Sequence, residues 1–465
     1  MDNFELWYRL HAKKGDLPDG VEKYFNYKYG VKKHAGIISG DYTKQAIGLY
    51  VDYTNNVTQR LGKAAGLTAG TDFDQFQMFG GRRRCNVLDD GTIIAYYGDN
   101  NFVEDGSNGQ VMVYQPKFYY KVEPIETEDI ETGIGKHLRK VKYWISDKEL
   151  NGFKLHPAFY NENGEAVDYI LMSAYEGSLY DTSESAYVTD DAQIMNVSED
   201  KLCSTAGVKP ASGKTQELTC SNIEQLAKNR GAGWHSLNIK ATSAEQLLML
   251  IELGTGNVQN AIGQGVAFIT DSPSATNNSS YTGSTSSLGN TTGRATETIN
   301  ERNSTEYTET ANGKTSITYR GVENFWGNIW KPVCGINIWG NGSMGGGQPY
   351  ICTDFNFSES KNSGNYVGAG FTVSNVSGYI KAFGYSSDFD WLFLPSEVGG
   401  NANGIIGDYS NVNANLNAYR TPYVGGRWHF GMYNGAFYWD ISTAVDKYYR
   451  SCGGRSVYVP HNVGG

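Results

Sequence analysis

Short hydrophobic segments, alternating or rich in aromatic residues and bounded by Gly, Asn and Asp, recur along the chain and predict strands. They lie at residues 48–52, 111–114, 117–122, 140–146 and 335–339. Apolar residues at helical spacing appear in two segments near the middle of the chain. The pattern therefore predicts a protein built mainly from strands, with few helices.

The two helices are predicted at 221–229 and 243–253. Their start and stop signals are two capping-box pairs and a C-cap glycine, namely Ser221 with Glu224, Thr242 with Glu245, and Gly254. We expect both helices to pack on one side of a sheet and to bury Trp234. They are therefore assigned to the core and not to a functional site.

The composition supports a β-rich protein of low charge. Of 465 residues, 39% are hydrophobic and 19% charged, with 57 Gly, 33 Tyr and 11 Pro. Such a mixture favours an all-β or irregular α+β fold over a helical one. The net charge of −10 argues against nucleic acid or an anionic membrane as the main partner.

The N-terminal residues and the cysteines do not indicate export. The first residues lack the basic and apolar regions of a secretory signal, and no apolar run approaches the roughly 18 residues of a membrane helix. We expect synthesis in the cytoplasm, so that an exposed function would require assembly into a particle such as a virion. The six scattered cysteines are expected to be free buried thiols, because no C-x-x-C spacing suggests zinc.

Three further segments carry expectations that depend on polar residues. Residues 271–316 are dominated by Ser, Thr, Asn and Gly, which predicts a surface-exposed irregular insertion. The run of three arginines at 82–84 could bind phosphate, but a solvated charge cluster or an intersubunit salt bridge is the favoured interpretation. His156, followed by Pro157, is interpreted as a packed turn histidine and not as a base.

Two landmarks mix aromatic residues with polar ones. The first, at 319–331, contains the charges Arg320 and Glu323 in an aromatic setting, so both need partners. Its other notable side chains are Asn324, which suits an irregular loop, and Trp326 and Trp330, which are expected to fill the centre.

The second landmark, at 392–460, alternates Gly and Trp with residues of mixed character. No helical or strand period accounts for this mixture. A rigid frame that carries freely chosen contact residues would account for it. The mixed residues, which we call the contact residues, are Tyr409, Tyr423, His429, Phe430, Tyr433, Asp440, Ser442, Asp446, Tyr448, Tyr449 and Ser451.

This segment resembles the variable region of the target proteins of diversity-generating retroelements. In that family, error-prone reverse transcription replaces template adenines, mostly in Asn codons, and the contact residues all belong to the set that such codons can reach. Trp428, Met432, Trp439 and Lys447 do not belong to that set, so the resemblance assigns them to the frame. The bland alternative is an ordinary Gly/Tyr-rich β domain with solvent-facing residues between its turns.

The resemblance implies an α+β C-type lectin-like fold of the formylglycine-generating-enzyme branch, with twisted antiparallel sheets, two flanking helices and long irregular loops. It is strongest at 225–265, 317–340 and 392–460. It implies an arm at 1–43 that attaches to other phage tail proteins, and a lectin-like body at 44–465 with variable region 400–460. The frame residues that it implies are Arg320, Glu323, Asn324, Trp326, Trp330, Trp428, Trp439 and Arg455.

By the same resemblance, the expected function is that of a receptor-binding protein at a phage tail tip, located in the virion. The expected partner is a host cell-surface protein or glycan, and the oligomeric state stays open with a homotrimer as one alternative. Neither nucleic-acid binding nor membrane insertion is expected. An invariant tail or baseplate subunit with the same fold is a structural alternative.

Catalytic and cofactor motifs give little support to an enzyme. The G-x-G-x-x-G match at 340–345 lies in Gly-rich repeats without a following helix, so no dinucleotide cofactor is expected. A formylglycine-generating enzyme is the catalytic alternative, but Arg455 is followed by Ser456 where that family has a cysteine. Cys452 lies upstream and has no partner cysteine nearby in the sequence. No catalytic residue and no metal are therefore expected.

Overall fold

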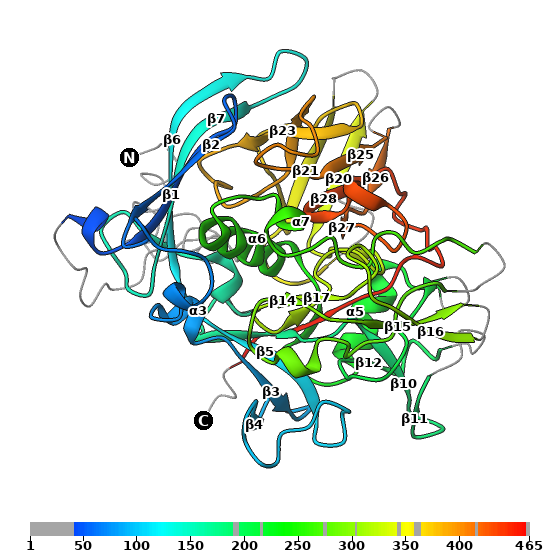
Figure 1. The fold of residues 1–465 in the computed structure, drawn as a ribbon. Coiled ribbons are helices and arrows are strands. Elements are labelled where there is room, and N and C mark those ends of the chain that lie inside the picture. Colours follow the sequence, from blue (N-terminus) through cyan, green and yellow to red (C-terminus); the bar gives the residue numbers. More distant parts are fainter. Residues whose placement is uncertain are drawn as a thin grey trace, which may run out of the picture.

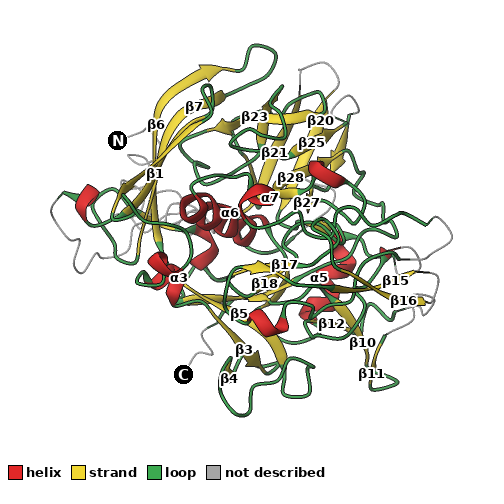
Figure 2. Cartoon of the chain, in the orientation of Figure 1, coloured by secondary structure: helices red, strands yellow, loops and turns green. Residues whose placement is uncertain are grey.

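The computed structural model describes residues 41–188, 195–213, 217–272, 277–302, 305–341, 346–357, 364–413 and 417–461. The predicted arm at 1–43 therefore lies outside the described residues, apart from its last three positions. Strands in several sheets make up most of the regular structure, and helices are few (Figure 2). The expected mixed α+β class, with antiparallel sheets predominating, is confirmed.

The largest sheet joins the N-terminal strands to the C-terminal part of the chain. Its pairs are antiparallel, except that β25 and β28 run parallel. Strand β28 lies between β27 and β25, and all seven of its residues are buried. The main path of the sheet is β19 (Lys331–Pro332), β27 (Tyr423–Gly425), β28 (Gly435–Ile441), β25 (Tyr409–Val412), β23 (Gly378–Tyr385), β7 (Lys136–Ser146), β1 (Ile47–Asp52) and β2 (Val57–Gly62), with β24 (Pro395–Val398), β6 (Tyr119–Asp129) and β8 (Lys154–Leu155) beside it.

The second sheet contains a buried strand near the C-terminus, β29 (Ser456–Tyr458). Strand β29 pairs with both β13 and β9, so Arg455, which directly precedes it, is completely buried. The order of this antiparallel sheet is β13 (Trp234–Ser236), β29 (Ser456–Tyr458), β9 (Tyr169–Ser173), β5 (Gln110–Pro116), β3 (Arg83–Val87) and β4 (Ile93–Tyr96).

Four smaller sheets complete the strand structure of the described residues. Their orders are β11 (Ala186–Tyr187), β10 (Ser178–Asp181), β12 (Lys201–Cys203); β14 (Gly293–Arg294), β17 (Ile317–Tyr319), β18 (Val322–Glu323); β15 (Thr298–Arg302), β16 (Thr305–Glu309); and β22 (Tyr366–Gly368), β21 (Gly346–Cys352), β20 (Ile336–Asn341), β26 (Ala418–Arg420). In Figure 1 the β15–β16 hairpin projects at the right-hand edge, while β20 and β21 lie near the C-terminal strands.

Helix α6 lies in the middle of the molecule, between the two largest sheets (Figure 1). All sides of α6 are buried, and its buried residues include the polar residues Thr242, Glu245, Gln246 and Glu252. The expectation of a helix that flanks one side of a sheet is therefore wrong for α6. The helices are α3 (Gln77–Gly80), α5 (Cys220–Lys228), α6 (Ile239–Leu253) and α7 (Val258–Ala261), with 3-10 turns η1 (Tyr42–Lys44), η2 (Thr71–Phe73), η3 (Pro157–Phe159), η4 (Ser286–Leu288) and η5 (Gly431–Tyr433).

Both predicted helices exist, but their capping boxes do not. Thr219 caps α5 and Asn238 caps α6, each through its side-chain oxygen. The glutamates of the expected boxes have distant partners, because Glu224 accepts hydrogen bonds from Ser236 and Glu245 pairs with Arg82. The predicted C-cap is confirmed, since Gly254 ends α6 in the left-handed conformation with φ 69°.

The polar segment 271–316 is buried in part, so the prediction of a wholly surface-exposed insertion is wrong for that part. Residues 277–280 are buried, as are Thr282 and Thr285. Hydrogen bonds replace the missing apolar contacts. Ser280 N donates to Asn328 Oδ1 at 2.6 Å, and Asn277 Nδ2 donates to the backbone of Pro210 at 2.9 Å. Composition predicted exposure because it does not show that polar groups find partners inside the fold.

The cysteines form one crosslink that the sequence did not predict. Cys220, at the start of α5, is disulfide-bonded to Cys334, with a Cα–Cα distance of 6.1 Å. The other four cysteines are free and buried, as expected. Among the described residues no helix is long and apolar enough to cross a membrane.

Candidate ligand-binding surface

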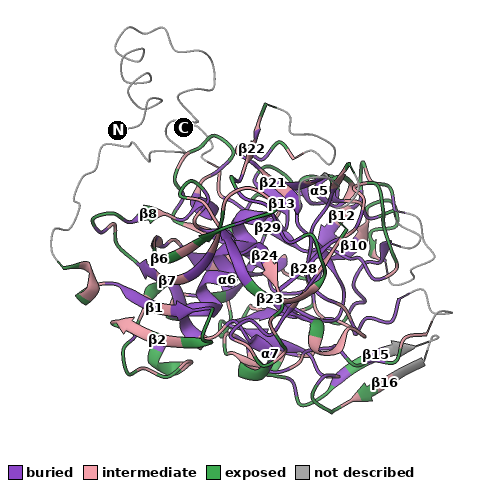
Figure 3. Cartoon of the chain, turned by 90° about the horizontal axis from the view of Figure 1, so that it is seen from above, coloured by how far each residue is buried: buried purple, intermediate pink, exposed green. Residues whose placement is uncertain are grey.

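Eight of the eleven predicted contact residues are accessible to solvent. Tyr433, Asp446, Tyr448 and Tyr449 are exposed, and Tyr409, His429, Phe430 and Ser442 are half-buried. Figure 3 shows how exposed and intermediate segments border the buried interior. The accessible residues come from β25, η5 and the turns that follow β27 and β28, so irregular backbone carries most of them.

Three predicted contact residues are buried, and the expectation that they lie on the exposed face is wrong. Tyr423 is 1% exposed, and its hydroxyl donates to the backbone of Lys447. Asp440 lies in the enclosed strand β28 and accepts hydrogen bonds from Ser442 N and Oγ at 2.9 and 2.7 Å. Ser451 Oγ accepts a hydrogen bond from Arg427 Nη1 at 2.7 Å. Their residue types fit the diversified set, but their hydrogen bonds hold the backbone.

Of the ten predicted frame residues, Met432 is half-buried and Lys447 is exposed, contrary to their assignment, because residue type alone does not fix burial. The other eight are buried. The indole nitrogens of three of them fix separate chain segments. Trp439 Nε1 donates to Phe393 O at 2.8 Å, Trp428 Nε1 to Asp271 Oδ1 at 2.9 Å, and Trp326 Nε1 to Gly263 O at 3.1 Å. The tryptophans therefore provide both apolar packing and directional contacts beneath the accessible residues.

The two charged frame residues of the first landmark are paired, as expected, but not with each other. Arg320 Nε and Nη2 each lie 2.7 Å from the carboxylate of Glu252 on α6, and Nη1 lies 2.8 Å from Asp74. The neighbouring Asn324 adopts φ 47° and accepts a hydrogen bond from Ile317 N through Oδ1. These contacts attach the landmark to the central helix.

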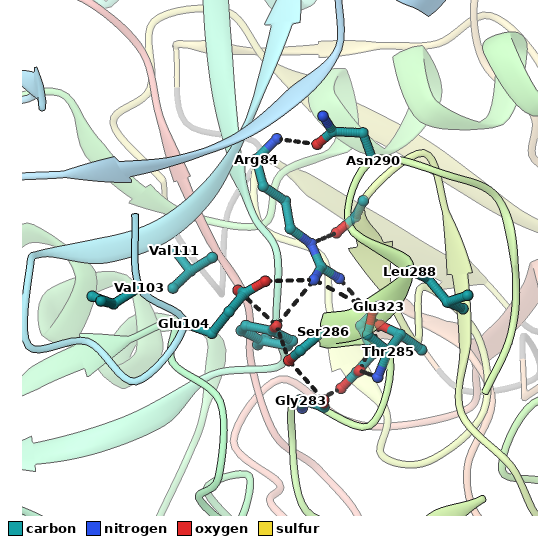
Figure 4. A network of polar contacts seen from close by, with 12 residues as sticks. Arg84, Val103, Glu104, Val111, Gly283, Thr285, Ser286, Leu288, Asn290 and Glu323 are labelled. Atoms are coloured by element: carbon teal, nitrogen blue, oxygen red, sulfur yellow. Dashed lines mark hydrogen bonds and ion pairs between the residues drawn. The ribbon is translucent and has the colours of Figure 1, made fainter. Parts of the chain in front are cut away.

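Glu323 belongs to a different network, shown in Figure 4. Its carboxylate accepts hydrogen bonds from Gly283 N at 2.8 Å and from both N and Oγ1 of Thr285 at 2.7 Å. Arg84 Nη2 donates to the same hydroxyl at 3.1 Å, and Arg84 Nη1 lies 3.0 Å from Glu104. Burial raises the pKa of Glu323, although these donors oppose that effect.

The arginine run at 82–84 is thus not the expected solvated cluster. Arg82 and Arg84 are buried in ion pairs with Glu245 and Glu104, and only Arg83 is exposed. Strand β3 explains the difference, because alternate residues point to opposite faces of the sheet. Neither buried arginine is free to bind phosphate.

Three tyrosines form an aromatic cluster on the accessible side of the large sheet. Tyr409 lies 4.4 Å from Tyr433 between ring centroids, and Tyr379 lies 5.5 and 5.6 Å from these two rings. They come from β25, η5 and β23, respectively. Because each ring is held by the other two, the cluster presents rigid contact area at a low entropic cost.

A second aromatic group adjoins the first through η5. Phe430 packs edge-on against Trp330 at 5.2 Å and against Tyr438 at 6.0 Å. His429 lies 5.4 Å from Phe430, and burial together with Arg427 lowers the pKa of His429 to about 4. His429 is therefore neutral near pH 7.

Two segments outside 400–460 reach the same region. Gly431 N donates to Ala267 O at 2.9 Å, which places the exposed Phe268 beside η5, and a Cβ on Gly431 would lie 3.1 Å from its ring. Arg450 stacks over Trp428 and bonds to Asp271. We use the term candidate surface for Phe268, Tyr379, Tyr409, Arg427, His429, Phe430, Met432, Tyr433, Ser442, Asp446, Tyr448, Tyr449 and Arg450.

The sequence did not single out five members of this candidate surface as contacts, and one of them, Met432, was assigned to the frame. Phe268 and Tyr379 lie outside the predicted variable region, and Arg427 and Arg450 were not among the mixed residues. Exposed Phe268 lies in the short apolar segment 266–269, whose other residues are buried, so no local signal marked it as a surface residue. Their placement depends on long-range contacts that only the folded chain shows.

Thiol or metal chemistry would need a reactive cysteine, for which Cys452 is the candidate, or a cluster of His, Cys, Asp or Glu side chains. Cys452, the cysteine nearest the terminal arginine, is completely buried, and burial raises its pKa to about 12. Such a thiol is not a nucleophile near neutral pH. Among the described residues no group of three His, Cys, Asp or Glu side chains could hold a metal ion.

Comparisons with known proteins find likenesses among solved structures. No family model matches the chain, and no curated protein matches it. Among solved structures, a chain described as "Major Tropism Determinant P3c Variant" is similar over 90% of this chain and 85% of its own length. The two sequences are 12% identical and the TM-score is 0.26, which is too low to show a common fold.

Proposed function

We propose that this protein is a receptor-binding protein of a phage or prophage tail tip. It binds a protein or glycan on the host surface through the candidate surface. The observation that carries the proposal is the partial separation of two residue sets, since eight of the eleven contact residues are accessible while eight of the ten frame residues are buried.

This separation suits a surface whose side chains change. Exposed substitutions usually alter stability by within about 0.5 kcal/mol, whereas truncation of a buried Trp costs about 3–5 kcal/mol. Tyr and small polar residues also dominate antibody paratopes, because Tyr gives rigid contact area and small polar residues adapt. Diversification of 400–460 by a retroelement is therefore part of the proposal.

The finer fold assignment, a C-type lectin-like body of the formylglycine-generating-enzyme branch, is likewise proposed from the sequence resemblance. It is supported by the position of β29 between β13 and β9, which returns the end of the chain to strands of the N-terminal half. The segment 1–43 would attach the protein to other tail proteins within the virion.

We propose a binding and not a catalytic role. The oxidase alternative requires a reactive cysteine pair, and Cys452 is buried with a raised pKa. The invariant structural subunit requires no exposed aromatic cluster. The accessible Tyr379, Tyr409 and Tyr433 therefore favour ligand binding over both alternatives.

Attachment of the labelled full-length chain to intact cells tests the proposal. The probe is a panel of bacterial strains that includes the natural host of the phage or prophage. Tyr433→Ala should abolish attachment with little change in melting temperature. Phe430→Ala should also abolish it, with a larger loss of stability because Phe430 packs on Trp330 and Tyr438.

Tyr97→Ala provides the matched control. Tyr97 is 38% exposed and lies edge-on to Phe102, as Tyr433 lies beside other rings, but it is outside the candidate surface. This variant should attach as the wild type does. Unchanged attachment of Tyr433→Ala and Phe430→Ala would refute the proposed surface.

A further inference from the structure

Arg427 lies between two aromatic rings in the candidate surface. Its guanidinium carbon is 4.2 Å from the ring centroids of both Trp330 and Phe430. Asn434 fixes the backbone beneath it, because Asn434 Oδ1 accepts from Arg427 N at 3.0 Å and Asn434 Nδ2 donates to Arg427 O at 2.8 Å. The arginine is therefore held in place before any ligand arrives.

Glycine at 426 makes this clamp possible. Gly426 has φ 80°, and a Cβ there would lie 1.8 Å from Asn434 Oδ1. The close approach of Asn434 to the Arg427 backbone therefore excludes any side chain at the preceding position.

Within the described residues, the guanidinium of Arg427 forms no ion pair, although Asp271 and Asp440 are near enough to raise its pKa against the lowering effect of burial. It donates one hydrogen bond, from Nη1 to Ser451 Oγ at 2.7 Å, and its Nε has no hydrogen-bond partner. Across the described ranges, no carboxylate lies within ion-pair distance of Arg427. Arg82 and Arg320 differ, since each is paired with a glutamate on α6.

An unpaired cation that is half-buried costs free energy, which stacking on two rings offsets in part. Burial accordingly lowers the pKa of Arg427. A ligand carboxylate would supply the missing ion pair with the planar geometry that a guanidinium prefers. The candidate surface also offers exposed aromatic side chains, because Phe268 and Tyr433 are each 44% exposed.

We propose that Arg427 anchors a carboxylate of the ligand, and that this carboxylate is an Asp or Glu side chain flanked by apolar residues on a host surface protein. A protein source is favoured over an acidic sugar because Phe268 has no polar atom to bind sugar hydroxyls, while aromatic residues and Arg are typical interface anchors. This inference rests on the proposed function, whose ligand chemistry it specifies.

The Nε–Hε resonance of Arg427 in the full-length chain, labelled with [15N]arginine, tests the anchor. Arg427→Met assigns the resonance by its loss. The probes are phenylacetate, which imitates an acidic group beside an apolar one, its neutral isostere phenylacetamide, and glucuronate, which carries its carboxylate on a sugar ring. Arg83→Met is the matched control, because Arg83 stacks on Tyr96 at 4.1 Å outside the candidate surface.

Phenylacetate should shift the Arg427 resonance in a saturable manner, and phenylacetamide should bind at least ten-fold more weakly. Measured on the ring protons of phenylacetate itself, binding should be several-fold weaker in Arg427→Lys and unchanged in Arg83→Met. Equal responses to phenylacetate and phenylacetamide, no response, or a similar shift of every arginine would overturn the anchor. Tighter binding of glucuronate than of phenylacetate would overturn the protein source.

These outcomes are separate from those of the attachment assay. If Tyr433→Ala abolishes attachment to cells but phenylacetate leaves Arg427 unaffected, the carboxylate anchor fails and the proposed function stands. If phenylacetate binds as expected but no cell in the panel, including the natural host, is bound, the proposed function fails.

Discussion

Asp271 and Arg450 are joined through one nitrogen, because Arg450 Nη2 lies 2.6 Å from both carboxylate oxygens of Asp271. This contact connects the start of the polar segment 271–316 to the turn that carries Tyr448 and Tyr449. Trp428 Nε1 donates to the same carboxylate at 2.9 Å. Burial of the Asp271 carboxyl opposes its ionisation, but the hydrogen bonds from Trp428 and Arg450 outweigh this effect and lower the pKa of Asp271.

Asp271→Asn should loosen the turn at 446–450. The substitution keeps the shape but removes the charge, and we expect a loss of about 1 kcal/mol, reduced by solvent because the side chain is 30% exposed. Urea unfolding measures the loss. Asp446→Asn is the control, since its only ion pair is with the adjacent exposed Lys447 among the described residues, and an equal loss in both variants would contradict this role.

Trp439→Ala should lower the free energy of unfolding by about 3–5 kcal/mol. Trp439 is completely buried, and the variant also leaves Phe393 O without the indole donor. Tyr433→Ala, at 44% exposure, should cost about 0.5–1 kcal/mol, including its ring contacts. Calorimetric melting of both variants distinguishes frame from contact residues, and similar losses would show that the two sets are not separate.

Reduction should destabilise the protein through the bond between Cys220 and Cys334. The bond spans 114 residues, and removal of a native disulfide typically costs about 2–5 kcal/mol. Dithiothreitol should therefore lower the melting temperature of the wild type but not that of the Cys220→Ser, Cys334→Ser double variant. Titration of six free thiols in the unreduced, denatured protein would contradict the crosslink.

Stability should fall in mild acid because of His156. The ring is completely buried and its Nδ1 accepts a hydrogen bond from Ala158 N, and burial lowers its pKa to about 3. The unfolded chain, with a pKa near 6.5, binds a proton that the folded chain does not. The stabilisation of the folded state by neutral His156 is thus complete above pH 6.5. It is lost as pH falls towards 3, by up to about 1.4 kcal/mol per pH unit.

His156→Asn keeps an acceptor for Ala158 N and removes the titrating ring. Urea midpoints measured between pH 6.5 and 4 should fall less steeply for this variant than for the wild type. Identical slopes would mean that His156 does not contribute. Absolute stability is expected to drop at every pH, because Asn does not fill the space between Phe118 and Trp391.

The class of fold could be predicted from local sequence, and the connections could not. Residues 48–52 and 140–146 were predicted as strands and lie in β1 and β7, because alternation is a local property. The helix starts were wrong because Glu224 and Glu245 are held by His235, Ser236 and Arg82. The interior position of 277–280 likewise depends on partners such as Asn328, far along the chain.

The candidate site shows the same limit. The frame residues could be predicted because Trp and Gly at fixed spacing favour a rigid backbone. The contact residues were separated from them by residue type, which does not reveal that Tyr423 and Asp440 lie in strands covered on both sides. Phe268 and Tyr379 were not predicted as contact residues, although they are accessible, because long-range packing places them at the candidate surface.

The central claim is that the accessible contact residues can change because they touch the ligand, while the frame cannot. Deep sequencing of the codons for 400–460, in a growing population of the organism that carries the gene, tests this most directly. We predict that substitutions concentrate at His429, Phe430, Tyr433, Asp446, Tyr448 and Tyr449 and are rare at Trp428, Trp439 and Arg455. An invariant segment, or substitutions spread evenly over buried and exposed positions, would contradict the account.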